Sequence, residues 1–161
     1  MPHAAALLRS RVPRIHLREV LTFNSNKDTI KGGAAALPEV ARIMRENPEL
    51  TLGVDGHVNF GQKPHAAIEL SAARAKNVCH RLRDLGVDLS RLVPQGLGYE
   101  RPRYPRGTKF ASRNRRVEFR VLPGSPLFER LAAEAEARRR QVNGVAMAES
   151  FSVPGSTLHA S

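Results

Sequence analysis

Cysteine and long apolar runs are both scarce in this sequence, and each scarcity excludes a class of protein. Cys79 is the only cysteine among 161 residues, so no disulfide can form within the chain. No apolar run approaches the ~18 residues that a membrane-spanning helix needs, which excludes such a helix. The apolar run at residues 4–8 is too short for a secretory signal, and its arginines follow it. Length and composition predict one folded domain with two tails.

Acidic residues are missing or rare in two stretches of the chain. Residues 1–18 contain four arginines and no acid, a bias shared with mitochondrial transit peptides, and the alternative is a disordered basic leader. Residues 98–122 hold eight basic residues and two acidic ones, in a chain whose net charge is +11. Such a patch attracts RNA, anionic lipid or an acidic protein surface.

Hydrophobic periodicity predicts an α+β domain with the element order β-α-β-α-β-β. Alternating apolar residues place strands at 15–23, 50–54, 92–97 and 116–122. Helical spacing predicts one helix at about 35–46. It predicts a second one with a buried stripe of Ala75, Val78, Cys79, Leu82 and Leu85, which Gly86 ends. We expect a mixed sheet with right-handed crossovers and both helices packed on one face.

The chain divides into four segments by composition. A basic leader covers residues 1–14, and the α+β domain covers residues 15–122. Two prolines within residues 123–126 interrupt the regular secondary structure. A C-terminal helix is predicted to follow at 127–142, with too few apolar residues to fold alone. The small, polar tail at 143–161 is predicted to be extended and disordered.

Residues able to carry catalysis or bind a metal do not form a known pattern. His57, His65, His80 and Cys79 follow no zinc-site spacing, and Cys79 is interpreted as a core residue. The Gly-Leu-Gly at 96–98 precedes a proline-rich turn instead of the helix that a nucleotide fingerprint requires. We therefore expect no enzyme, no cofactor and no metal, and interpret His57 as a hydrogen-bonded structural group.

Six separated segments carry a resemblance to a known family. They are ALPEVARIMRENPEL, VDGHVN, LSAARAKNV, LGVDLSRL, GLGYERP and NRRVEF. In this order and spacing they resemble OmpA-like C-terminal domains over about residues 15–122. Members of that family sit in bacterial envelopes and hold peptidoglycan by the diaminopimelate of its stem peptide. The resemblance implies the OmpA-like fold, and it implies where a ligand pocket would lie.

The resemblance implies three ligand positions, and two of them are altered here. The family has a carboxylate after the second strand, an asparagine eight residues later, and the arginine of an L-S-x-x-R-A motif. This chain has Asn59, Ala67 and Arg74 at those positions. An amide offers no charge to a ligand ammonium, and a charge-assisted hydrogen bond is worth roughly 1.5–3 kcal/mol. The pocket is therefore expected to be degenerate and its ligand lost, with Arg74 bonded either to a ligand or to loop carbonyls.

Aromatic residues interleave with the late basic patch. Tyr99, Tyr104 and Phe110 alternate with cations, a pattern that suits RNA, and the alternative is an ordinary loop of the fold that is basic. Candidate contacts to an anionic partner are Arg101, Arg103, Arg106, Lys109, Arg113, Arg115 and Arg116.

These observations lead to one main functional hypothesis and two alternatives. The altered pocket, the basic leader and the absent secretory signal favour a non-catalytic structural subunit of a large mitochondrial or other organellar assembly. Its partners would be protein subunits, with RNA or anionic lipid as further ones. One alternative is a peptidoglycan-binding module of the bacterial periplasm or cell envelope. The other is a ribosomal-type subunit that contacts RNA through residues 98–122.

Overall fold

A computed structural model describes residues 13–17 and 19–150, and its element order extends the predicted one. The strands are β1 (Arg14–Ile15), β2 (Leu21–Phe23), β3 (Ile30–Gly32), β4 (Leu52–Gly56), β5 (Leu92–Gly96) and β6 (Arg116–Val121). The α-helices are α2 (Leu37–Glu46), α3 (Pro64–Asp84) and α4 (Pro126–Ser150). Three short 3-10 helices are η1 (Ala34–Ala36), η2 (Leu89–Arg91) and η3 (Ala111–Asn114).

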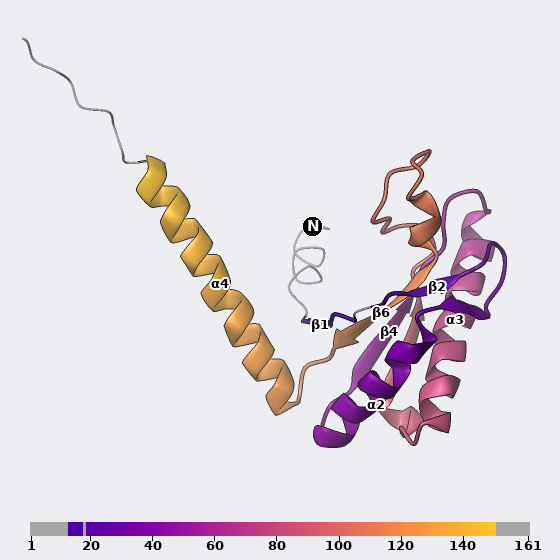
Figure 1. Cartoon of the computed structure of the whole chain (residues 1–161), viewed down its shortest axis with the longest axis horizontal. Helices are drawn as coiled ribbons and strands as arrows, with labels where there is room; N and C mark the ends of the chain where they lie inside the picture. The colour runs from indigo at the N-terminus through magenta and orange to yellow at the C-terminus, as the bar shows by residue number, and fades with distance from the viewer. Residues whose placement is uncertain (1–12, 18, 151–161) are drawn as a thin grey trace, which may run out of the picture.

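The strands form one mixed sheet in the order β3-β2-β6-β4-β5, with β1 also paired to β6. Only β4 and β5 run parallel, because α3 crosses over between them, while the other pairs are antiparallel. Figure 1 shows α2 and α3 beside this sheet. The predicted α+β class with a mixed sheet is confirmed.

The core lies between the sheet and these two helices. Along β6, Val117, Phe119 and Val121 join the core, so the alternate residues of the strand face the other side of the sheet. The apolar stripe of α2 is fully buried against the strands, at Leu37, Val40, Ala41 and Met44. One face of the sheet is therefore apolar, and the other carries charged side chains.

Two predicted boundaries near the N-terminus are wrong. The single strand expected at 15–23 is two strands, β1 and β2, and the loop expected at 24–33 contains β3. Strand β3 has three residues with one large apolar side chain, Ile30, so no alternation could reveal it; its pairing with Phe23 defines it instead. Gly33 ends β3 with φ 83°, and a side chain there would collide with the carbonyl oxygen of Val20.

The ends of the domain also differ from the prediction. Arg14 was placed in the leader, but it pairs with Arg120 in the sheet. Leu85 was placed in the buried stripe of α3, yet it lies after the helix end and is 39% exposed. Helix α4 begins at Pro126 and continues to Ser150, beyond the expected end at 142. Residues 143–150 can continue the helix because Gly144 is the one residue among them that strongly disfavours a helix.

Among the residues whose side chains the structure describes, helix α4 packs on the core through its first turns. Leu127 belongs to the core, and Phe128 and Leu131 pack against it. Figure 1 shows the rest of α4 running away from the sheet. None of the helices in the described part of the chain is long and apolar enough to span a membrane. Residues 1–12 of the leader and 151–161 of the tail lie outside the described residues.

Candidate functional site

A polar recess of about 190 Å³ opens where β4 ends. Its walls come from the β2–β3 loop, the loop after β4, the middle of α3 and the start of β6. The lining residues are Ser25, Asn26, Val58, Asn59, Phe60, Gly61, Gln62, Leu70, Arg74 and Arg115. Gly56 brings α3 close to the end of β4, because a Cβ there would lie 1.9 Å from the carbonyl oxygen of Ser71.

Arg74 holds the base of this recess together. Its guanidinium donates to the carbonyl oxygens of Lys27 (2.8 Å), His57 (3.0 Å) and Asn24 (2.9 Å), and it lies over the Phe23 ring. The side chain is fully buried, and burial, with a smaller contribution from Arg115, lowers its pKa to about 10. The interpretation of Arg74 as a residue that bonds loop carbonyls is confirmed. Its role toward a ligand stays a prediction.

The other polar side chains of the recess are amides and a second arginine. Asn59 accepts a long hydrogen bond of 3.4 Å from Asn114, and Gln62 donates to Asn26 across the mouth of the recess. Arg115 donates through Nε to the carbonyl oxygen of Phe23 at 3.0 Å. None of the lining residues is acidic, so the recess has two cations and no carboxylate of its own.

Ala67 does not belong to the recess. Ala67 is 1% exposed on α3 and packs toward Gly98. A Cβ added at Gly98 would lie 3.6 Å from the Cβ of Ala67. The structure therefore brings Asn59 and Arg74 together and leaves the third predicted position out. Asn26 and Gln62 were missed, because they lie in polar loops 36 residues apart whose meeting no local pattern encodes.

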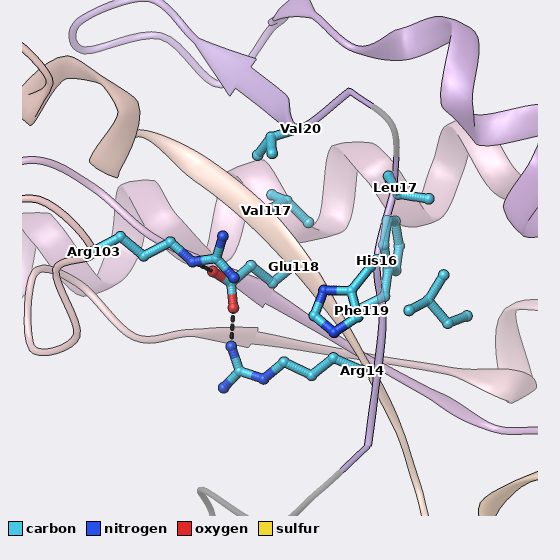
Figure 2. Close-up of a pocket in the computed structure, with 9 residues that line it drawn as sticks. Arg14, His16, Leu17, Val20, Arg103, Val117, Glu118 and Phe119 are labelled. Atoms are coloured by element: carbon cyan, nitrogen blue, oxygen red, sulfur yellow. Dashed lines mark hydrogen bonds and ion pairs between the residues drawn. The ribbon is translucent and has the colours of Figure 1, made fainter. Parts of the chain in front are cut away.

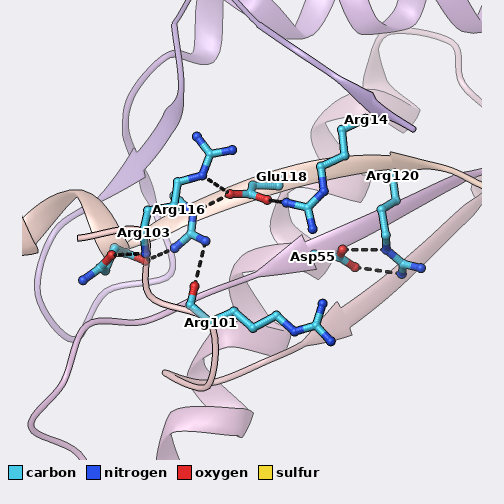
Figure 3. Close-up of polar contacts among 8 residues, drawn as sticks. Arg14, Asp55, Arg101, Arg103, Arg116, Glu118 and Arg120 are labelled. Carbon is cyan, nitrogen blue, oxygen red and sulfur yellow. Dashed lines mark hydrogen bonds and ion pairs between the residues drawn. The ribbon is translucent and has the colours of Figure 1, made fainter. Parts of the chain in front are cut away.

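The face of the sheet that points away from α2 and α3 carries a second group of arginines, and these are paired with carboxylates. Glu118 accepts hydrogen bonds from Arg116 (2.6 Å) and Arg14, and it forms an ion pair with Arg103, with 2.8 Å between Nε and the carboxylate oxygen. Beside it, Arg120 holds Asp55 with two hydrogen bonds of 2.6 and 2.9 Å. Figure 3 shows both groups side by side along β4 and β6. Burial raises the pKa of Glu118, but the hydrogen bond and charge of Arg116 outweigh it, and the net pKa is lowered.

A small cavity of about 70 Å³ adjoins this ion cluster. Figure 2 shows Arg14 and Arg103 converging on Glu118 at one side of it, with His16 and the apolar Leu17, Val20, Val117 and Phe119 around the rest. Its one carboxylate is already bonded to arginines of the chain. The cavity therefore belongs to the structural ion cluster.

His57 is buried next to that cluster without the hydrogen bond that we expected. Neither ring nitrogen has a partner among the described residues, so the interpretation as a hydrogen-bonded group is wrong. Burial, and then the charge of Arg116, lowers its pKa to about 3, so the ring is neutral at neutral pH. Only its backbone is engaged, with N–H bonded to Arg116 and C=O to Arg74.

Apart from Arg115, which lines the recess, the predicted basic contacts lie in three different environments. Arg116 is buried and Arg103 is bonded to Glu118, which makes both part of the internal cluster. The exposed Arg106, Lys109 and Arg113 lie over aromatic rings at 4.8–5.9 Å from the ring centres. Arg101 is half-buried, and its carbonyl accepts from Arg116. Contact of any of them with RNA, lipid or an anionic protein stays a prediction.

The comparison with known families decides the relationship. The model of the OmpA family matches residues 22–116. The chain belongs to the OmpA family. It is 35% identical over 105 residues to the probable lipoprotein YiaD of Escherichia coli, covering 64% of this chain and 48% of that protein. It is 34% identical over 108 residues to outer membrane protein Omp38 of Acinetobacter baumannii, covering 64% and 30%. The chain thus spans less than half of these relatives.

Solved structures of OmpA-like domains agree with the fold. The OmpA-like domain of FopA1 from Francisella tularensis is 25% identical with a TM-score of 0.55, covering 63% of this chain and 68% of that one. The C-terminal domain of Helicobacter pylori MotB is 22% identical with a TM-score of 0.62, covering 75% and 96%. The peptidoglycan-associated lipoprotein of Burkholderia pseudomallei is 19% identical with a TM-score of 0.59, covering 65% and 89%. The last two likenesses support the fold alone.

The main functional hypothesis from the sequence is therefore wrong. The relatives are a probable lipoprotein and an outer membrane protein of bacteria, which contradicts a mitochondrial or other organellar subunit of a large assembly. The four arginines of residues 1–18 misled the prediction, because basic bias alone does not distinguish a transit peptide from any other basic segment.

Proposed function

We propose that this domain is a non-catalytic, peptidoglycan-binding module of the bacterial cell envelope, and that the recess at the end of β4 holds the stem peptide. Membership of the OmpA family and the envelope relatives support this role. One observation carries it: two arginines and no carboxylate line the recess, which also contains Asn59 and Arg74, two of the three positions where the family resemblance places the ligand. A cationic recess in a family of binding domains suits an anionic group of a ligand.

The carboxylate end of diaminopimelate would meet Arg115 first. Arg74 is fully buried beneath the β2–β3 loop, whereas Arg115 is half-buried and lines the recess. Arg115 uses Nε for the Phe23 carbonyl, and its two terminal nitrogens have no partner among the described residues. A guanidinium with both terminal nitrogens available can bind a carboxylate with two parallel hydrogen bonds.

The ammonium end of the same side chain would meet amide oxygens. The carbonyl oxygen of Asn59 has a second lone pair beyond its long bond with Asn114, and Asn26 and Gln62 line the same recess. Neutral acceptors bind an ammonium less strongly than a carboxylate does, by about 1.4 kcal/mol or tenfold. The site is therefore expected to bind weakly.

Cosedimentation with purified peptidoglycan sacculi tests this function. Wild type is expected to pellet with sacculi, and a free diaminopimelate tripeptide should release it, whereas the matched lysine tripeptide should release less because it lacks one carboxylate. The Arg115→Gln variant should pellet less, and Arg45→Gln, which removes an exposed charge on α2, should behave as wild type. Failure of wild type to pellet, or equal release by both peptides, would contradict the proposal.

A further inference from the structure

Residues 99–114, here called the basic-aromatic loop, form a charged surface that the stem-peptide site does not use. This loop contains five basic residues and one acidic residue, Glu100. Figure 1 shows this segment, with η3 at its end, standing out from the sheet at the top of the view. Such charge density exceeds what solubility of a small domain requires.

Three exposed cations of this loop, Arg106, Lys109 and Arg113, lie on aromatic rings and not on carboxylates. Arg113 lies over Phe110 and Tyr104, with its guanidinium 4.8 and 5.9 Å from the ring centres, and Lys109 is 4.9 Å from that of Phe110. None of the ion pairs in the described part of the chain includes Arg106, Lys109 or Arg113. Their charge is therefore available to a partner, while the rings keep the cations in place.

The basic-aromatic loop is continuous with the recess. Phe60 lines the recess, pairs with the Tyr99 ring at 6.0 Å between ring centres, and lies under Arg106 at 5.6 Å. Asn114 fixes the loop to the recess wall, because its amide bonds the backbone of Arg103 and Tyr104 and also contacts Asn59. A ligand that fills the recess therefore emerges beside these rings and cations.

We propose that the basic-aromatic loop, together with Phe60, binds the glycan strand of peptidoglycan beside the stem-peptide site. This inference rests on the proposed function and names the part of the polymer that this surface contacts. Sugar rings have apolar C–H faces that pack on aromatic rings, and their hydroxyls accept hydrogen bonds from guanidinium groups. Carboxylates of neighbouring stem peptides would meet the unpaired cations.

An anionic membrane surface fits the loop less well. A segment that inserts into a lipid interface presents a contiguous apolar face. Here Phe110 is 39% exposed and lies between two cations, and Phe60 and Tyr99 pair with each other beside the recess. The rings are therefore flanked by cations and lie next to a polar recess. This arrangement fits a sugar better than it fits a membrane surface.

Calorimetric titration of the protein with a stem peptide that carries, or lacks, its glycan sugars tests this surface. The ligands are a free diaminopimelate tripeptide and the same tripeptide on its disaccharide. The disaccharide is expected to raise the affinity of wild type about tenfold. A Tyr99→Leu, Arg106→Gln double variant should keep the affinity for the free tripeptide and lose most of this increment. Arg45→Gln is the matched charge control, on exposed α2, and should keep the increment.

The outcomes separate this inference from the proposed function. Equal affinity for both ligands, or an increment that survives in the double variant, would overturn the glycan surface while leaving the stem-peptide site intact. If neither the free tripeptide nor the disaccharide tripeptide binds, the test is sedimentation of the protein with glycan strands from which the peptides have been removed. Binding of wild type that the double variant loses would support the glycan surface alone. No binding of wild type would overturn the inference. Binding to phosphatidylglycerol vesicles but not to stripped glycan would assign the loop to a membrane and overturn the inference.

Discussion

Arginines gather in two regions of this domain, and among the described residues carboxylates are bonded to the arginines of only one of them. On the face of the sheet away from the helices, Glu118 is bonded to three guanidinium groups and Asp55 to a fourth (Figure 3). At the end of β4, Arg74 and Arg115 bond backbone carbonyls and share a recess with amides. The two regions have the same kind of cation but different partners.

The difference indicates which region is structural and which can bind a ligand. A guanidinium paired with a buried carboxylate is already compensated, and separating the pair leaves an uncompensated charge. A guanidinium that bonds neutral carbonyls keeps its charge available to an anion. Substitutions should therefore change stability in the ion cluster and affinity in the recess, and each prediction below tests that division.

The largest expected effect is on stability, in the ion cluster. Glu118→Gln removes the negative charge that three arginines share, and it should lower the free energy of unfolding by about 3–5 kcal/mol. Urea denaturation measures this, with the exposed Glu49→Gln as the control, expected to change stability by less than about 0.5 kcal/mol. Similar losses in the two variants would show that the cluster does not stabilise the fold.

Restoring the family asparagine at position 67 should destabilise the domain instead of building a ligand contact. Ala67 is buried outside the recess, so Ala67→Asn should lower the free energy of unfolding by about 1–3 kcal/mol without raising affinity for a stem peptide. The neighbouring Ala66→Asn is exposed and serves as the matched control in thermal denaturation. Tighter peptide binding by the Ala67 variant would place this position back in the site.

Stability should fall as the pH is lowered below 6.5, because buried His57 must gain a proton on unfolding. Its pKa is about 3 in the folded state, lowered by burial and then by Arg116, against 6.5 ordinarily. The unfolded state therefore binds more protons between these values, and stability decreases with falling pH by at most about 1.4 kcal/mol per unit. Urea denaturation between pH 6.5 and 5 measures the slope.

The His57→Gln variant isolates that slope. It cannot titrate, so its stability should depend less on pH over the same range, where Glu118, with its lowered pKa, stays ionised. Identical slopes in the two proteins would mean that the His57 ring is not buried as a neutral group.

The smallest expected effect is a gain of affinity in the recess. Asn59→Asp keeps the acceptor for Asn114 and adds a charge that can pair with a ligand ammonium, so affinity for a diaminopimelate tripeptide should rise about tenfold. Calorimetry at low salt measures it, and the lysine tripeptide, which has the same ammonium, should gain similarly. No gain for either peptide would place the ammonium away from Asn59.

Regular elements with a strong hydrophobic period could be predicted from the sequence. The stripe of α2 and the alternation of Val117, Phe119 and Val121 in β6 predict the observed core, because burial of one face imposes those periods. Strand β3 and the break between β1 and β2 could not be predicted, since short strands depend on partners distant in the chain.

The candidate site was predictable only where a motif fixed the spacing. Asn59 and Arg74, fifteen positions apart, do meet at the recess, whereas Ala67 faces the packing beside Gly98. Arg115 lies beside Phe23 and Arg74 because β6 pairs with β2, and Gln62 meets Asn26 through two loops. Contacts of this kind come from the tertiary fold, which local patterns do not encode.

The most direct test of the recess as a ligand site is calorimetric titration of wild type with the diaminopimelate tripeptide and the matched lysine tripeptide. The account predicts weak binding of the first, with a dissociation constant of about 0.1–1 mM. It predicts about tenfold weaker binding of the second, because only the first has a carboxylate beside its side-chain ammonium that can pair with Arg115. No binding of the diaminopimelate peptide to wild type or to Asn59→Asp, or equal binding of both peptides, would contradict it.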